Sequence, residues 1–223
     1  MRPLIAFDLD GTLIDSKRDL AESANEMLAT YGAPPLAEVE VAGMVGDGAK
    51  QLVQRALDAG GVPTDVSVAL DRFLAIYSGR LFRHTRPYPG LPDAVAAAAE
   101  RASLAVLTNK PEGPSRTLLD GFGLSRYFQW VIGGDSGFPR KPDPSGLDHL
   151  MRQAGVTPGA CLMVGDSMMD VETARSAGAA VCVAEYGFGH LRRPLELDGT
   201  ELIARRPEDV AGLIAGFVGA LNR

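Results

Sequence analysis

The sequence predicts an α/β fold in which a parallel sheet carries an inserted helical domain. Short apolar runs of strand length alternate with helix-length segments through the second half of the chain, which is typical of a parallel sheet with helices on both faces. The first apolar run ends near residue 8, whereas the next begins near residue 104. This gap far exceeds the roughly 30 residues of a strand–helix–strand unit. We therefore expect a Rossmann-like core interrupted by an insertion.

The strands of the sheet are expected where the apolar runs are short and continuous. They cover residues 4–7, 104–108, 129–133, 161–165, 180–184 and 201–204. Helical patterns fill the intervals between the later strands and end near glycines, at 115–123, 145–155 and 169–179. A last helix is expected to begin with Pro207 in its first position and to close the core.

The insertion is expected to be a small helical bundle. Apolar side chains recur at helical spacing within residues 20–31, 52–57 and 70–81, and glycines or prolines separate these segments. Residues 86–90, with two prolines and a glycine, predict the hinge that returns to the sheet. The predicted division is a core domain of residues 1–15 and 85–223 and a cap domain of residues 16–84.

Composition narrows the classes of protein and partner. The 223 residues are 46% hydrophobic and carry a formal charge of −6, which argues against a nucleic-acid or anionic membrane partner. Aspartates stand where a signal peptide would continue its apolar stretch, so we expect a cytoplasmic protein, either a monomer or a homodimer. Cys161 and Cys182 lie in apolar runs and are expected to be buried, reduced thiols. Small molecules are the expected partners.

Charged and polar residues stand where four predicted strands or loops reach one edge of the sheet. They are Asp8, Asp10, Thr108, Asn109, Lys110, Lys141, Asp166 and Asp170. Ligands of open parallel sheets bind at the carboxyl ends of the strands, so these side chains are expected to meet there. Converging carboxylates repel one another strongly, and Mg²⁺ is the cation that all-oxygen ligands suit. Lys141 would neutralise part of the remaining charge.

The segments "DLDGT", "LTNKP", "KPDP" and "GDSMMD" resemble, in order, the four motifs of the haloacid dehalogenase-like superfamily. The resemblance covers nearly the whole chain and includes a helical cap inserted after the first motif. It implies that Asp8 is a nucleophile that forms an aspartyl-phosphate, and that Asp10 is the acid that protonates the leaving oxygen and then the base that activates water. Thr12 is expected to position Asp10.

The resemblance also implies a metal site and a phosphate site. Asp8, Asp166 and the backbone carbonyl of Asp10 would hold Mg²⁺, while Asp170 would act from behind the ligands by orienting Lys141 or a metal-bound water. Three groups would bind the phosphoryl oxygens: the Thr108 hydroxyl, the Asn109 amide and the Lys141 ammonium.

The cap contains a loop that indicates substrate specificity. Residues 43–57 are similar to the specificity loop of bacterial phosphoglycolate phosphatases, as are "LTNKP" and "YGFG" at 186–189. The loop amides at Gly46 and Gly48, with Lys50 as counter-charge, would receive a carboxylate; a plain surface turn is the alternative. Asp47 stands where the relatives more often have Asn, and we expect it to cap the following helix.

These features predict a Mg²⁺-dependent phosphatase of small phosphomonoesters, with 2-phosphoglycolate as the first candidate substrate. Asp10 argues against dehalogenases, which lack this aspartate, and the cap pattern argues against phosphonate hydrolases. Other small phosphate esters, pyrophosphate and a phosphosugar mutase activity remain open. A phospho-accepting signalling domain also remains, although Asp10 and the inserted cap argue against it.

Overall fold

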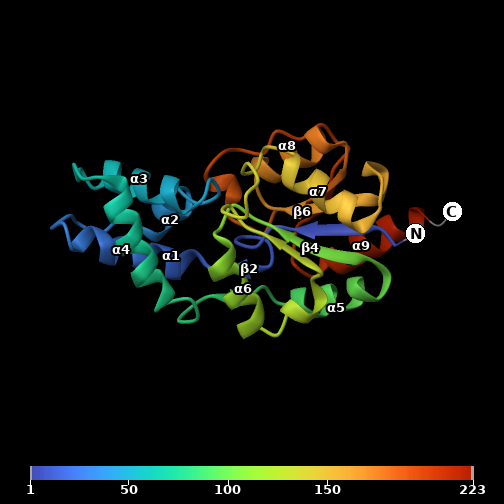
Figure 1. Cartoon of the computed structure of the whole chain (residues 1–223), viewed down its shortest axis with the longest axis horizontal. Helices are drawn as coiled ribbons and strands as arrows, with labels where there is room; N and C mark the ends of the chain where they lie inside the picture. Colours follow the sequence, from blue (N-terminus) through green and yellow to red (C-terminus); the bar gives the residue numbers. More distant parts are fainter. Residues whose placement is uncertain (1, 222–223) are drawn as a thin grey trace.

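The computed structural model describes residues 2–221 and contains a six-stranded parallel sheet at its centre (Figure 1). The strand order is β5, β4, β1, β6, β7, β8. Their bounds are β1 Leu4–Phe7, β4 Ser103–Leu107, β5 Trp130–Ile132, β6 Cys161–Gly165, β7 Ala180–Ala184 and β8 Leu202–Ala204. Each of the predicted strands is present, with ends shifted by at most one residue, and the α/β class is confirmed.

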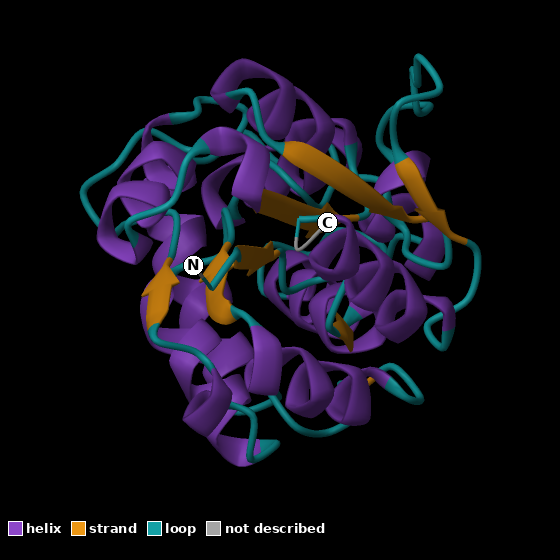
Figure 2. Cartoon of the chain, turned by 90° about the vertical axis from the view of Figure 1, so that its right-hand side faces the viewer, coloured by secondary structure: helices purple, strands orange, loops and turns teal. Residues whose placement is uncertain are grey.

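Helices cover both faces of this sheet, as Figure 2 shows. In β1, Ile5 and Phe7 join one apolar cluster, which contains residues of α5 and α9, and Leu4 and Ala6 join another, which contains residues of α7 and α8. This alternation follows from the two-residue period of a strand. The helices of the core are α5 Leu91–Arg101, α6 Glu112–Gly121, α7 Ser145–Ala154, α8 Met168–Ala177 and α9 Asp209–Ala220. The short 3-10 helices are η1 Ser125–Tyr127, η2 Pro158–Ala160 and η3 Gly189–Leu191.

The helices of the insertion lie to one side of the sheet, at the left of Figure 1. They are α1 Lys17–Ala29, α2 Glu38–Ala42, α3 Ala49–Ala59 and α4 Val66–Ser78. The three predicted helical segments correspond to α1, α3 and α4, whereas α2 was not expected. Apolar residues of α1, α3 and α4 belong to the same cluster as Ile5 and Phe7, so the helices share one continuous apolar core with the sheet. We refer to α1–α4 as the helical cap.

Two features at the ends of elements differ from the expectation. The predicted hinge at 86–90 contains a strand, β3 (Arg86–Pro87), which pairs antiparallel with β2 (Ile14–Asp15). This pairing joins the segment that leads into the insertion to the segment that returns from it. The last helix begins at Asp209 and does not have Pro207 in its first position. The Asp209 carboxylate accepts a 2.9 Å hydrogen bond from the Arg206 amide, which closes a turn before the helix. No helix within residues 2–221 is both long and apolar enough to cross a membrane.

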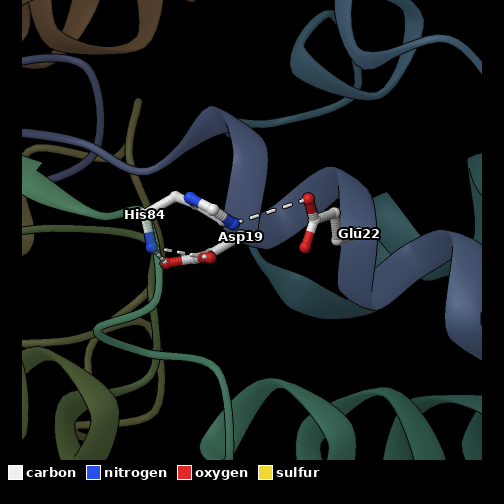
Figure 3. Close-up of side chains that lie close together, drawn as sticks. All are labelled: Asp19, Glu22 and His84. Carbon is white, nitrogen blue, oxygen red and sulfur yellow. Dashed lines mark hydrogen bonds and ion pairs between the residues drawn. The ribbon is translucent and has the colours of Figure 1, made fainter.

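A fully buried carboxylate, Asp19, ties α1 to the segment that returns to the sheet (Figure 3). It accepts hydrogen bonds from the His84 amide at 2.9 Å, the Thr85 amide at 2.7 Å and the Thr85 hydroxyl at 2.7 Å. Nearby Glu22 pairs with Arg18 at 2.9 Å and with Arg80 at 2.8 Å. Because both carboxylates already have partners, this cluster is a structural connection between cap and core.

We expect Asp19→Ala to lower the free energy of unfolding by about 3 kcal/mol, because it leaves buried donors of His84 and Thr85 without an acceptor. Urea unfolding measures the change. Asp71→Ala, at an exposed position of α4, is the control and should shift the value by less than about 0.5 kcal/mol. Equal effects of the two substitutions would contradict the assigned role of Asp19.

Candidate active site

A small cavity lies at the carboxyl ends of the strands, between the sheet and the helical cap. Its volume is about 50 Å³. Eight of the residues singled out from the sequence line it: Asp8, Asp10, Gly46, Gly48, Thr108, Asn109, Lys110 and Asp166. The structure therefore brings the predicted strand-end groups together, and it adds the cap loop to them.

Lys141 bridges two carboxylates behind the cavity. Its ammonium nitrogen lies 3.0 Å from Asp8 Oδ1 and 2.6 Å from Asp170 Oδ1. Asp170 Oδ2 accepts hydrogen bonds from the Ser167 hydroxyl at 2.7 Å and the Ser167 amide at 3.1 Å. Burial lowers the pKa of Lys141, but Asp170 and Asp8 outweigh it and hold that pKa above its ordinary value. Lys141 is thus a fixed cation, and Asp170 holds it in place.

The remaining carboxylates are buried in a way that suits a bound cation. Burial raises the pKa of Asp8 to about 6, and burial followed by the charges of Asp170 and Asp8 raises the pKa of Asp166 well above its ordinary value. Oxygens of Asp8, Asp166 and Asp170 lie within 4.8 Å of one another. Since both oxygens of Asp170 already have partners, Asp8 and Asp166 are the carboxylates suited to hold a divalent cation.

The backbone around Asp166 shapes this site. Asp166 Oδ2 accepts hydrogen bonds from the amides of Phe188 at 2.9 Å and Gly189 at 2.8 Å. Both amides belong to the "YGFG" segment, which therefore has a physical role in orienting the carboxylate. Gly11 has φ +82°, and a Cβ there would stand 1.9 Å from Asp166 Oδ2. Only glycine at this position leaves room for the Asp166 carboxylate.

Asp10 is held by residues other than the one expected. The Ser16 hydroxyl donates to Asp10 Oδ1 at 2.6 Å, and the Lys110 ammonium lies 3.0 Å from Oδ2 and 3.2 Å from Oδ1. The expectation that Thr12 positions Asp10 is not supported, because the buried Thr12 hydroxyl has no hydrogen-bond partner within the described chain. The Thr12 carbonyl instead accepts a hydrogen bond from Tyr186 at 2.9 Å.

Sequence patterns assigned Lys110 no specific role and placed Tyr77 within the helical segment 70–81. Lys110 donates a 2.6 Å hydrogen bond to the Tyr77 hydroxyl, and its ammonium lies 4.5 Å from the centre of the Tyr77 ring. Burial raises the pKa of Tyr77 to about 12, so the hydroxyl stays neutral. The position of Lys110 directly after Thr108 and Asn109 was the available signal, but the partner on α4 was not visible in the sequence.

The cap loop contacts the core through Asn109. The side-chain amide donates to the carbonyls of Gly46 at 2.8 Å and Lys141 at 3.0 Å, and its oxygen accepts from the Lys141 amide at 2.9 Å. Asn109 therefore holds the backbone of Lys141 in place and also contacts the cap loop at Gly46. Its expected function, binding a phosphoryl oxygen through its backbone amide, remains a prediction.

Asp47 and Lys50 do not line the cavity. Asp47 accepts hydrogen bonds from Arg55 and, at 3.1 Å, from Arg192 of the core. The expectation that Asp47 caps α3 is wrong, because Gly48, with φ +89°, is the residue at the N-cap position. The Asp47 carboxylate instead accepts hydrogen bonds from the two arginines. Lys50 is exposed on the first turn of α3. Of the four residues proposed from this loop, only the two glycines face the cavity.

Comparisons with known proteins agree with this geometry. The model of the haloacid dehalogenase-like hydrolase family matches residues 5–184. A phosphoglycolate phosphatase of Pseudomonas putida is 39% identical over 218 residues, which cover 96% of this chain and 79% of the relative. A phosphoglycolate phosphatase of Rhodospirillum rubrum is 43% identical over 196 residues, covering 84% and 81% of the two chains.

Among solved structures, that of a predicted phosphoglycolate phosphatase from Haemophilus somnus matches with a TM-score of 0.89 and 33% identity, covering 95% of this chain and 97% of that one. The chain belongs to the haloacid dehalogenase-like hydrolase family, as the four motifs predicted. It is a phosphoric monoester hydrolase of that family.

The raised pKa of Asp8 predicts that the free energy of unfolding depends on pH through this carboxylate. The pKa moves from 3.8 to about 6, so the stability associated with Asp8 is present below about pH 4 and is lost as the pH rises through 6. In metal-free protein, the unfolding free energy of Asp8→Asn minus that of the parent should therefore increase by about 2 kcal/mol from pH 4.5 to 7.5.

Urea unfolding in EDTA across this pH range measures the difference. Asp71→Asn, at an exposed position, is the control and should show no such trend. A difference between Asp8→Asn and parent that stays constant or falls with pH would contradict the buried, destabilised state of Asp8.

Proposed function

We propose that the protein is a Mg²⁺-dependent phosphatase that hydrolyses 2-phosphoglycolate to glycolate and phosphate through an aspartyl-phosphate on Asp8. The observation that carries this proposal is that Asp8 and Asp10 line one small cavity and that each has its own lysine, Lys141 for Asp8 and Lys110 for Asp10. Two carboxylates with separate environments suit separate tasks, one as nucleophile and one as acid and base. The names of the relatives support 2-phosphoglycolate as the substrate.

In the first half-reaction, a carboxylate oxygen of Asp8 forms a bond to phosphorus while the bond from phosphorus to the bridging ester oxygen breaks. Asp10 gives its proton to that oxygen, and glycolate leaves. In the second half-reaction, Asp10 takes a proton from water, whose oxygen attacks phosphorus and displaces Asp8. Lys141 and the Thr108 hydroxyl bind the phosphoryl oxygens and offset charge in both transition states.

Mg²⁺ fits the carboxylates that the structure assembles. Asp8 and Asp166 would hold it, together with the Asp10 carbonyl by resemblance to the family. When bound, the ion supplies positive charge to the phosphoryl group and relieves the repulsion between the buried carboxylates. Asp170 would act only through Lys141 and Ser167, which occupy both of its oxygens.

The cavity favours a small substrate. About 10–15 Å³ holds one water molecule, so a volume of about 50 Å³ suits a short ester better than a bulky one. The residues inserted at 16–84 would act as the cap that closes over the substrate on the core of residues 1–15 and 85–223. We place this activity in the cytoplasm, in a monomer or homodimer that acts on a small phosphorylated metabolite.

A panel of about twenty phosphate esters with Mg²⁺ tests the proposal. We expect 2-phosphoglycolate to give the highest kcat/KM, with repeated turnover, and EDTA to abolish the activity. Asp8→Asn is nearly isosteric but lacks a nucleophilic carboxylate, so we expect it to lose at least about 1,000-fold in kcat.

Each alternative has its own signature in this panel. Higher activity with pyrophosphate or another ester would replace the substrate, an isomerised sugar phosphate would indicate a mutase, and a single turnover would indicate a signalling domain. Asp8→Asn activity within tenfold of the parent would contradict the covalent mechanism.

A further inference from the structure

Lys110 is a buried cation that the proposed reaction does not use. Among the described residues that line the cavity it carries the only ammonium group, and its residue exposure is 7%. Lys141 is held behind the cavity by Asp8 and Asp170. A buried ammonium facing a small cavity is costly unless an anion accompanies it. In this structure the anion is Asp10, at 3.0 Å.

During the reaction, Asp10 cannot remain an anionic partner of Lys110. As the acid, Asp10 carries a proton and must reach the bridging oxygen of the ester, and a neutral carboxylic acid is a weaker partner for an ammonium than a carboxylate is. The ammonium then lies beside the leaving group with a donor to spare. A second anion on the substrate would complete its coordination.

The size of the proposed substrate fits this reach. In 2-phosphoglycolate one methylene separates the bridging oxygen from the carboxyl carbon, so the bridging and carboxylate oxygens are about 3–4 Å apart at ordinary bond lengths. Asp10 contacts the bridging oxygen in the proposed mechanism, and Lys110 lies 3.0 Å from Asp10 Oδ2. The carboxylate can therefore reach hydrogen-bond distance of the same ammonium.

Tyr77 of the helical cap holds this ammonium in position. Its hydroxyl accepts a hydrogen bond from Lys110 at 2.6 Å, and its ring lies 4.5 Å below the ammonium. The ring stacks on Phe73, with centroids 5.7 Å apart, which fixes its orientation on α4. The ammonium is thus held by Asp10 of the core and by Tyr77 of α4 in the cap.

We propose that Lys110 is the specificity-determining residue that binds the substrate carboxylate, and that Tyr77 positions it. This inference rests on the proposed function and narrows its substrates to short phosphomonoesters with a carboxylate close to the ester oxygen. It replaces Lys50 as the recognising cation, since Lys50 is exposed and outside the cavity.

The test compares kcat/KM for 2-phosphoglycolate with that for 2-hydroxyethyl phosphate, which keeps the phosphoryl group and chain length but lacks the carboxylate. Effects that act through Asp10 change both values and cancel in their ratio. We expect Lys110→Met to lower this ratio at least about 30-fold, as for loss of a charge-assisted contact in a buried site. Lys50→Met removes a lysine of the same length outside the cavity, and it should change the ratio less than twofold.

Tyr77→Phe provides a second, milder variant. It keeps the ring against Phe73 and removes only the hydroxyl that accepts from Lys110, so we expect the ratio to fall about threefold to tenfold. If Lys110→Met does not fold, this variant decides the question alone. Lys110→Arg should retain more of the ratio than Lys110→Met, because it keeps the charge.

The outcomes separate this inference from the proposed function. A parent that prefers 2-phosphoglycolate, combined with an unchanged ratio in Lys110→Met or Tyr77→Phe, would overturn the role of Lys110 and leave the substrate assignment intact. A fall in the ratio in Lys50→Met alone would also overturn it, in favour of Lys50. A parent that shows no preference for the carboxylate would overturn the substrate assignment and this inference together.

Discussion

Repulsion between carboxylates at the buried end of the sheet is the constraint on which the rest of the site depends. Asp8, Asp166 and Asp170 present oxygens within 4.8 Å of one another, where little water screens their charge. The fold brings them there because β1 and β6 pair in parallel and end at the same edge. Lys141 compensates one part of this charge, and a divalent cation is the natural compensation for the other.

Two lysines divide the work around this cluster. Lys141 pairs with Asp8, and Lys110 pairs with Asp10, so each carboxylate has its own cation. The two pairs differ in what surrounds them. Among the described residues, the Lys141 ammonium pairs with Asp8 and Asp170 of the core, whereas the Lys110 ammonium also contacts Tyr77 of the cap. On the proposed function, phosphoryl transfer would take place on the core, and the surface shared by core and cap would select the rest of the substrate.

The sheet and most helices were predictable because their signals are local. Continuous apolar runs such as 161–165 form buried parallel strands, and the apolar spacing of α1, α3 and α4 follows the helical period. The five residues of α2 and the two-residue strands β2 and β3 are too short to show any period. These elements depend on tertiary contacts, so sequence patterns did not reveal them.

The candidate site divides in the same way. Motifs at strand ends located Asp8, Asp10, Lys141 and Asp166, because parallel strands place their carboxyl ends together. The contacts of Lys110 with Tyr77 and of Asp47 with Arg192 join residues 33 and 145 positions apart, and no local pattern predicts such pairs. The resemblance to the family assigned Thr12 to Asp10, whereas in the structure Ser16 makes that contact.

The most direct test asks whether Asp8 and Asp166 bind a divalent cation. It is a calorimetric titration of the metal-free protein with Mg²⁺ at pH 6, in two buffers of different ionisation enthalpy. Burial raises the pKa of Asp8 to about 6, so at pH 6 this carboxylate carries a proton in about half of the molecules, and a metal ion must displace it. Burial also raises the pKa of Asp166 above its ordinary value. We expect Mg²⁺ to bind with release of protons, and the release to be smaller in Asp8→Asn. Binding without proton release, or no binding at all, would contradict the claim that these buried carboxylates form a binding site for a divalent cation.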